Sequence, residues 1–195
     1  MKVLCDCDLV IAPSDVKWYK WLCALSGESP VIPNKDADYN LANYFIDFEK
    51  KTGYNPHSFW DSANLYYNMP VINGADKVLD GVSLNGGSIL IASHTKGGHF
   101  SSKYKYHVDN LKHVDFSRGS GNGFFATKEK YLLTCDLAID DRAENLVLFP
   151  SDVVKVYFKT RYFDPYLDCL KTQQNVFITG IDDPWKDIEN YLGGV

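Results

Sequence analysis

The first ten residues constrain this chain more than any other stretch. The segment KVLCDCDLV (residues 2–10) begins with an apolar run that ends at Asp6, and a second carboxylate, Asp8, follows two residues later. A short apolar run followed by acids predicts a buried strand with both carboxylates at its carboxyl end. Carboxylates in such a place are costly unless a cationic group lies between them. The segment therefore predicts a charged site at one edge of a sheet.

Composition narrows the class of protein. The chain has 195 residues, 45% of them hydrophobic, which suits one globular domain or one domain with an insertion. Its net charge of −5, without a long basic run, argues against a long nucleic acid as partner. Five cysteines, an odd number, argue against a disulfide framework. The sequence shows neither a signal-peptide pattern nor a membrane-spanning apolar run, so we expect a cytoplasmic protein without a membrane partner.

Apolar segments and amphipathic segments alternate along most of the chain. This alternation predicts an α/β fold, a Rossmann-like parallel sheet with helices on both faces. Strands are expected at residues 2–6, 88–93, 124–127, 137–140, 153–158 and 175–181. Helices are expected at residues 14–27, 41–53, 57–68, 74–84 and 101–113, and from Pro184 onward.

One part of the chain has helical patterns but no strand pattern. Residues 13–71 are therefore expected to form a small helical cap, inserted after the first strand. Residues 1–12 and 72–195 would form the core domain. Ligands of open parallel sheets bind at the carboxyl ends of the strands. Asp6, Ser93 and Asp140 are all expected at that edge.

Four features with chemical potential follow one another in a fixed order: the Asp6-x-Asp8 pair, Ser93, Lys130 and the Asp140-Asp141 pair. Each one alone is common in proteins. Together, at the ends of successive predicted strands, they are much more specific. A phosphoacceptor receiver domain uses the same residue types, but its phosphoacceptor lies on a middle strand, and the order found here does not fit it.

In these features the chain resembles the haloacid dehalogenase-like phosphatase superfamily. The matching segments are DCDLV, the strand ILIAS that ends at Ser93, Lys130, and the strand LAIDD. Within the superfamily it is similar to the 5′(3′)-deoxyribonucleotidases, through the segments TKEK, LAIDDR and IDDPWKDI and through Lys103 in SKYKYHV. It departs from that family after Ser93, where His94 and Thr95 replace the usual Ser and Pro.

The resemblance implies a division of labour between the first two acids. Asp6 would be the nucleophile that attacks phosphorus and becomes an aspartyl-phosphate. Asp8 would be the general acid and base, which protonates the leaving oxygen and later deprotonates the attacking water. Mg²⁺ would be the cofactor, because converging carboxylates repel one another and offer the oxygen ligands that it prefers. The metal ligands would be Asp6, Asp8 (through its main-chain carbonyl), Asp140 and Asp141.

Other residues would bind the substrate. Ser93, Lys130 and Lys103 would hold the phosphate oxygens. A small-molecule (deoxy)nucleoside monophosphate is the expected substrate, with Phe59 and Trp60 stacking on its base or, alternatively, only packing the cap onto the core. His94 and Arg142 are further substrate-binding candidates.

Two other functions stay open at this point. One is a phosphatase of the same superfamily that acts on a sugar phosphate or a polynucleotide end. The other is a non-catalytic binding module with the same fold. The sequence does not determine the base, the 5′ or 3′ position of the phosphate, or the oligomeric state.

Overall fold

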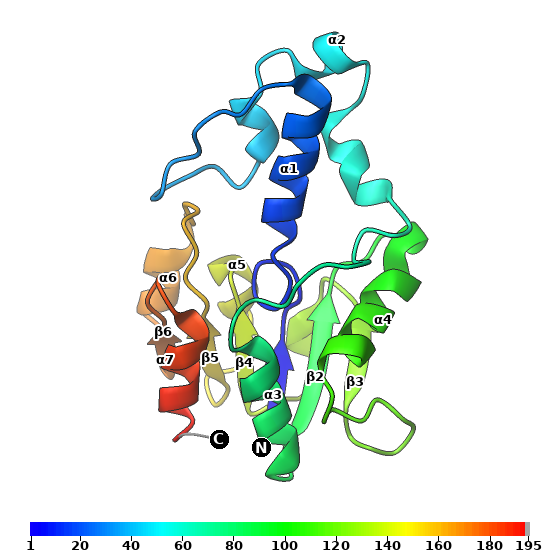
Figure 1. Ribbon diagram of the computed structural model, residues 1–195. Coiled ribbons are helices and arrows are strands. Elements are labelled where there is room, and N and C mark those ends of the chain that lie inside the picture. Colours follow the sequence, from blue (N-terminus) through cyan, green and yellow to red (C-terminus); the bar gives the residue numbers. More distant parts are fainter. Residues whose placement is uncertain (194–195) are drawn as a thin grey trace.

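The computed structural model of the protein describes residues 1–193 and contains a single sheet of six strands (Figure 1). All neighbouring strands are parallel, in the order β3-β2-β1-β4-β5-β6. The predicted Rossmann-like α/β fold is thereby confirmed. The strands are β1 (Lys2–Cys5), β2 (Ser88–Ser93), β3 (Gly123–Ala126), β4 (Leu137–Asp140), β5 (Val154–Tyr157) and β6 (Val176–Ile178).

Strand β1 lies in the middle of the sheet because its side chains are apolar on both faces. Leu4 pairs with Leu90 of β2 on one side and Ala138 of β4 on the other. Val3 and Cys5 pack into one hydrophobic core, and Leu4 packs into a second core on the opposite face. A parallel strand with both faces buried has this composition.

Helices cover both faces of the sheet. The helices α3 (Ala75–Leu84), α4 (Phe100–Asn110) and α7 (Pro184–Tyr191) contribute side chains to the core that contains Val3. The short helices α5 (Ala143–Leu146) and α6 (Leu167–Lys171) cover the face that contains Leu4. None of the helices within residues 1–193 has the length and apolar composition needed to cross a membrane.

Residues 13–71 lie beyond the carboxyl ends of the strands, in the upper part of Figure 1. This segment contains the helices α1 (Ser14–Ser26) and α2 (Phe48–Thr52) and the 3₁₀ turns η1 (Leu41–Tyr44) and η2 (Pro56–Asp61). Two further 3₁₀ turns, η3 (Gly97–His99) and η4 (Lys130–Leu132), belong to the rest of the chain.

The expected helices at residues 41–53 and 57–68 are not continuous. Asp47, with φ of 55°, separates η1 from α2, and the second segment becomes η2 followed by turns up to Asn68, with φ of 53°. An apolar spacing of three residues fits a 3₁₀ turn as well as an α-helix. The left-handed Asp47 interrupts the first segment, and the extended backbone of Ser62 (φ −68°, ψ 123°) ends η2 in the second, so neither forms one longer helix.

Candidate active site

A tight loop after β1 positions the first two acids. The main-chain N–H of Asp6 donates to the carbonyl of Ile139 (2.9 Å), which extends the β1–β4 pairing by one residue. The loop then closes on itself, with the N–H of Ala12 donating to the carbonyl of Cys7 (2.9 Å) and Leu9 at a φ of 62°. Cys7 is fully buried in the core, whereas Asp6 and Asp8 both line a cleft.

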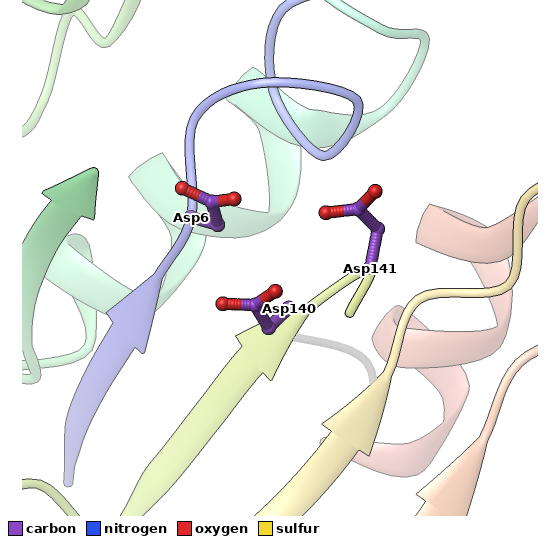
Figure 2. Close-up of side chains that lie close together, drawn as sticks. All are labelled: Asp6, Asp140 and Asp141. Atoms are coloured by element: carbon purple, nitrogen blue, oxygen red, sulfur yellow. The ribbon is translucent and has the colours of Figure 1, made fainter. Parts of the chain in front are cut away.

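Three carboxylates converge where β1 and β4 end (Figure 2). Asp6 follows β1, Asp140 is the last residue of β4, and Asp141 follows it. Each offers one oxygen, and these oxygens lie within 4.8 Å of one another. All three side chains are buried. The strand order brings them together, because β1 and β4 are neighbours in the sheet but lie more than 130 residues apart in the chain.

Lys130, at the start of η4, is the cation beside this acidic cluster. Its Nζ lies 2.6 Å from Oδ2 of Asp140 and 2.9 Å from Oδ1 of Asp6. Burial lowers the Lys130 pKa, but the charges of Asp140 and Asp6 outweigh burial and raise it overall. The single charge of Lys130 therefore stands against three clustered carboxyl groups, and it contacts two of them.

Burial and mutual repulsion raise the pKa values of Asp6 and Asp141, whereas the charge of Lys130 lowers them. Burial raises the pKa of Asp6, and the Lys130 charge only partly offsets this. Burial, followed by the charges of Asp140 and Asp6, raises the pKa of Asp141 well above its ordinary value. The cluster therefore gains from a further positive charge.

The donor atoms of the cluster fit a hard divalent cation such as Mg²⁺, which prefers carboxylate oxygens. Oδ1 of Asp6 is buried and accepts no hydrogen bond from the described residues, since its contact with Lys130 is an ion pair without hydrogen-bond geometry. Asp140 is held firmly, because its Oδ1 accepts from the N–H of Arg142 (2.9 Å) and from Nδ2 of Asn145 (3.0 Å).

Asp8 has different partners from the three clustered acids. Its Oδ2 accepts from Nζ of Lys103 (2.6 Å) and its Oδ1 accepts from the hydroxyl of Tyr66 (2.7 Å). Burial alone would raise the Asp8 pKa, but the charge and hydrogen bond of Lys103 outweigh burial and lower it. The Asp8 side chain lies outside the acidic cluster. Any metal contact from Asp8 would therefore have to come from its main-chain carbonyl.

Lys103 connects Asp8 to the end of β2. It projects from α4, is fully buried, and donates to Oγ of Ser93 (2.8 Å) and to the carbonyl of His94 (3.1 Å). Burial lowers the Lys103 pKa, but Asp8 outweighs burial and raises it. The structure thus brings Lys103, Ser93 and Asp8 into one hydrogen-bonded group.

A cleft of about 360 Å³ opens onto both groups. Asp140 and Lys103 lie beneath its surface, while the side chain of His94 is exposed at its mouth. Arg142 is also exposed and forms an ion pair with Glu144 (2.5 Å). The lining residues are Asp6, Asp8, Leu9, Tyr39, Ser93, His94, Lys128, Lys130, Asp141, Arg142, Glu144 and Asn145.

Phe59 and Trp60, the expected base-stacking pair, lie outside this cleft, and only Trp60 lines another cleft. Phe59 is buried and packs against Trp21 and Trp60, with ring centroids 5.8 and 5.0 Å apart. Trp60 lines an adjacent cleft of about 310 Å³ together with Trp18 and other residues of the 13–71 segment. The two clefts share Leu9, Tyr39 and Arg142 as lining residues.

Sequence reasoning missed three residues that bind the acids. Tyr66 contacts Asp8, and Asn145 contacts Asp140. The Tyr39 hydroxyl lies 3.0 Å from Oδ2 and 2.8 Å from the main-chain carbonyl of Asp141. Asn145 could have been suspected, because it lies one turn beyond the acid pair. The two tyrosines belong to the 13–71 segment, and no local pattern distinguishes them from the other tyrosines there.

Comparison of the sequence with protein-family models and with curated protein sequences gives no match. Solved structures, however, resemble it over nearly its whole length. A HAD-superfamily hydrolase from Ehrlichia chaffeensis matches with a TM-score of 0.51 and 15% identity, covering 98% of this chain and 95% of the other. The chain has the fold of that HAD-superfamily hydrolase. A candidate phosphatase from Clostridium difficile matches with a TM-score of 0.54 and 11% identity, covering 96% and 97%. At these identities the likeness establishes the fold.

Proposed function

We propose that this protein is a Mg²⁺-dependent phosphomonoesterase that removes phosphate from (deoxy)nucleoside monophosphates. One observation carries the proposal. Two carboxylates two residues apart line one cleft in different settings, Asp6 within an acidic cluster and Asp8 bonded to a lysine and a tyrosine. A phosphatase that forms a covalent intermediate needs one nucleophilic carboxylate and one that transfers protons.

Asp6 is the proposed nucleophile. An oxygen of its carboxylate would attack phosphorus in line with the leaving oxygen, and the phosphorus–oxygen ester bond would break as the aspartyl-phosphate forms. Water would then attack the aspartyl-phosphate and release inorganic phosphate. Ser93 and Lys130, which line the cleft, would hold the phosphate oxygens, and Lys103 behind Ser93 would add positive charge, which supports a phosphate-bearing substrate over a neutral one.

Asp8 would transfer the protons in both steps. Lys103 favours the charged form of Asp8, which is the form that accepts a proton from the attacking water. A phosphate bound beside Ser93 and Lys103 adds negative charge near Asp8 and raises its affinity for a proton. That shift would prepare Asp8 to protonate the leaving oxygen.

Asp6, Asp140 and Asp141 would hold Mg²⁺. When bound, the ion neutralises the carboxylates and the negative charge of the phosphate. Lys130 supplies a permanent positive charge beside Asp6 and Asp140. Hydrogen bonds from Asn145 and from the main-chain N–H of Arg142 fix Asp140, and Lys130 links Asp140 to the proposed nucleophile Asp6.

The adjacent cleft supports a nucleotide substrate. Its walls include Trp18, Trp60, Tyr39 and Tyr162, so a flat ring would find aromatic surfaces there. Stacking on such surfaces contributes on the order of 1–3 kcal/mol per base. We propose that residues 13–71 act as the substrate-selecting cap, with Trp60 contacting the base and Phe59 packing behind it. A sugar phosphate would gain less from these walls.

Phosphate release by the purified protein tests the proposal. The panel contains deoxy- and ribonucleoside 5′-monophosphates, a 3′-monophosphate and a sugar phosphate, each with Mg²⁺ or EDTA. We expect release from nucleotides with Mg²⁺ only, and none from a folded Asp6→Asn variant. Full activity of that variant, or activity unaffected by EDTA, would refute the mechanism. A preference for the sugar phosphate would refute the substrate class, and binding without turnover would indicate a non-catalytic module.

A further inference from the structure

Tyr39 joins the 13–71 segment to the acidic cluster. Its hydroxyl lies 2.8 Å from the main-chain carbonyl and 3.0 Å from Oδ2 of Asp141, and the second contact is the only side-chain hydrogen bond that residues 1–193 provide to that carboxylate. Asp6 and Asp140 each contact Lys130, but Asp141 has no such ion pair among the described residues. The group that orients the Asp141 carboxylate is therefore a neutral hydroxyl.

The orientation leaves the other oxygen of Asp141 available. No hydrogen bond from the described residues reaches its Oδ1, and Asp141 lines the cleft. Figure 2 shows the Asp141 carboxylate beside Asp6 and Asp140, beyond the end of β4. A carboxylate with one oxygen fixed and the other free is prepared to bind a cation, because less rotational freedom is lost on binding.

Tyr39 is itself held rigidly. Its ring stacks on Tyr162 with centroids 4.8 Å apart, and the guanidinium of Arg142 lies 5.5 Å from its centroid. Two main-chain hydrogen bonds attach Ala37 to the loop after β5, one to the carbonyl of Arg161 (3.0 Å) and one from the N–H of Phe163 (2.9 Å). The hydroxyl is thus fixed relative to the sheet, although it comes from a different part of the chain.

We propose that Tyr39 is a positioning residue for the metal site, and that residues 13–71 complete this site through its hydroxyl. The inference rests on the proposed function only in taking Asp141 as a metal ligand. Partners that orient a metal ligand typically account for 10- to 100-fold in metal affinity. Tyr39→Phe keeps the stacked ring and removes only the hydroxyl.

Calorimetric titration of the substrate-free protein with Mg²⁺ tests the inference, with thermal unfolding to verify that each variant is folded. We expect Tyr39→Phe to raise the Kd for Mg²⁺ about 10-fold. Tyr44→Phe is the matched control, because the Tyr44 hydroxyl accepts from the N–H of Asp38 (2.8 Å) in the same loop and does not contact Asp141. We expect its Kd to stay within about twofold of the wild-type value.

A double-mutant cycle separates positioning from a general loosening of the loop. If Tyr39 acts through Asp141, adding Tyr39→Phe to an Asp141→Ala variant leaves the weakened Kd unchanged. An equal loss in both backgrounds, or a wild-type Kd for Tyr39→Phe, overturns the inference while leaving the proposed function intact. A wild-type protein that binds no Mg²⁺ overturns both. These outcomes are therefore distinguishable.

Discussion

The sharpest prediction concerns the buried charge of Asp141. Asp141→Asn keeps the size of the side chain and can still accept the hydrogen bond from Tyr39, but it removes one of three clustered charges. Two unit charges 4.8 Å apart, the upper bound on the distances between the clustered oxygens, repel by about 3 kcal/mol at an effective dielectric constant of about 20. We expect the variant to be about 2–3 kcal/mol more stable than the wild-type protein at pH 8 in EDTA.

The pH dependence of this gain follows from the sign of the pKa shift. Burial and the neighbouring acids raise the pKa of Asp141 in the folded protein above its unfolded value of about 4. Stability is therefore fully present below the unfolded pKa and is lost as the pH rises through the folded pKa. Asp141→Asn does not ionise at this position, so its stability does not fall in this way as the pH rises. The two proteins should be equally stable near pH 4 and should diverge as the pH rises.

Thermal unfolding in EDTA at several pH values measures the difference, and about 2–4 °C per kcal/mol is expected for a chain of this size. Asp168→Asn is the matched control, because Asp168 is exposed and should change stability by less than about 0.5 kcal/mol. Saturating Mg²⁺ should stabilise the wild-type protein more than Asp141→Asn. The reasoning would be refuted by a variant that is less stable than wild type at pH 8 in EDTA.

Three further predictions concern other residues. Lys103→Met should lower kcat about 100-fold or more, since it removes a donor shared by Asp8 and Ser93. Because Lys103 lowers the Asp8 pKa, the variant should also shift the part of the pH–rate profile that reports Asp8 to higher pH. An unshifted profile would contradict the pairing. Trp60→Ala should raise KM for nucleotides by about 5- to 100-fold and leave KM for a sugar phosphate nearly unchanged, as steady-state kinetics would show. Burial lowers the pKa of His107 to about 3, so unfolding takes up a proton below about pH 6.5 and stability falls as the pH is lowered from about 6.5 toward 3. His107→Phe should weaken that fall in a series of denaturant unfolding curves, and an identical pH dependence would disprove it.

Local sequence predicted a residue's position best where that position depends only on the strand to which the residue belongs. The apolar run before Asp6 predicted β1, and the same reasoning placed Ser93 and Asp140 at strand ends, where the structure has them. Parallel topology then predicted that these residues share one edge, because every carboxyl end of such a sheet points the same way. The helical spacing in residues 41–68 was less informative, because the left-handed Asp47 and the extended Ser62 interrupt it.

The 2–10 segment and the strand-end residues thus determined the sheet, the edge that carries the site and the acids that line it. Tertiary structure alone decided how the two acids of that segment differ. Asp8 is separated from Asp6 by partners far away in sequence, Lys103 and Tyr66, and Asp141 is oriented by Tyr39. The two tyrosine contacts depend on where residues 13–71 lie over the sheet. No periodicity or spacing encodes that placement, because it follows from packing between segments and not from the backbone preferences of either one.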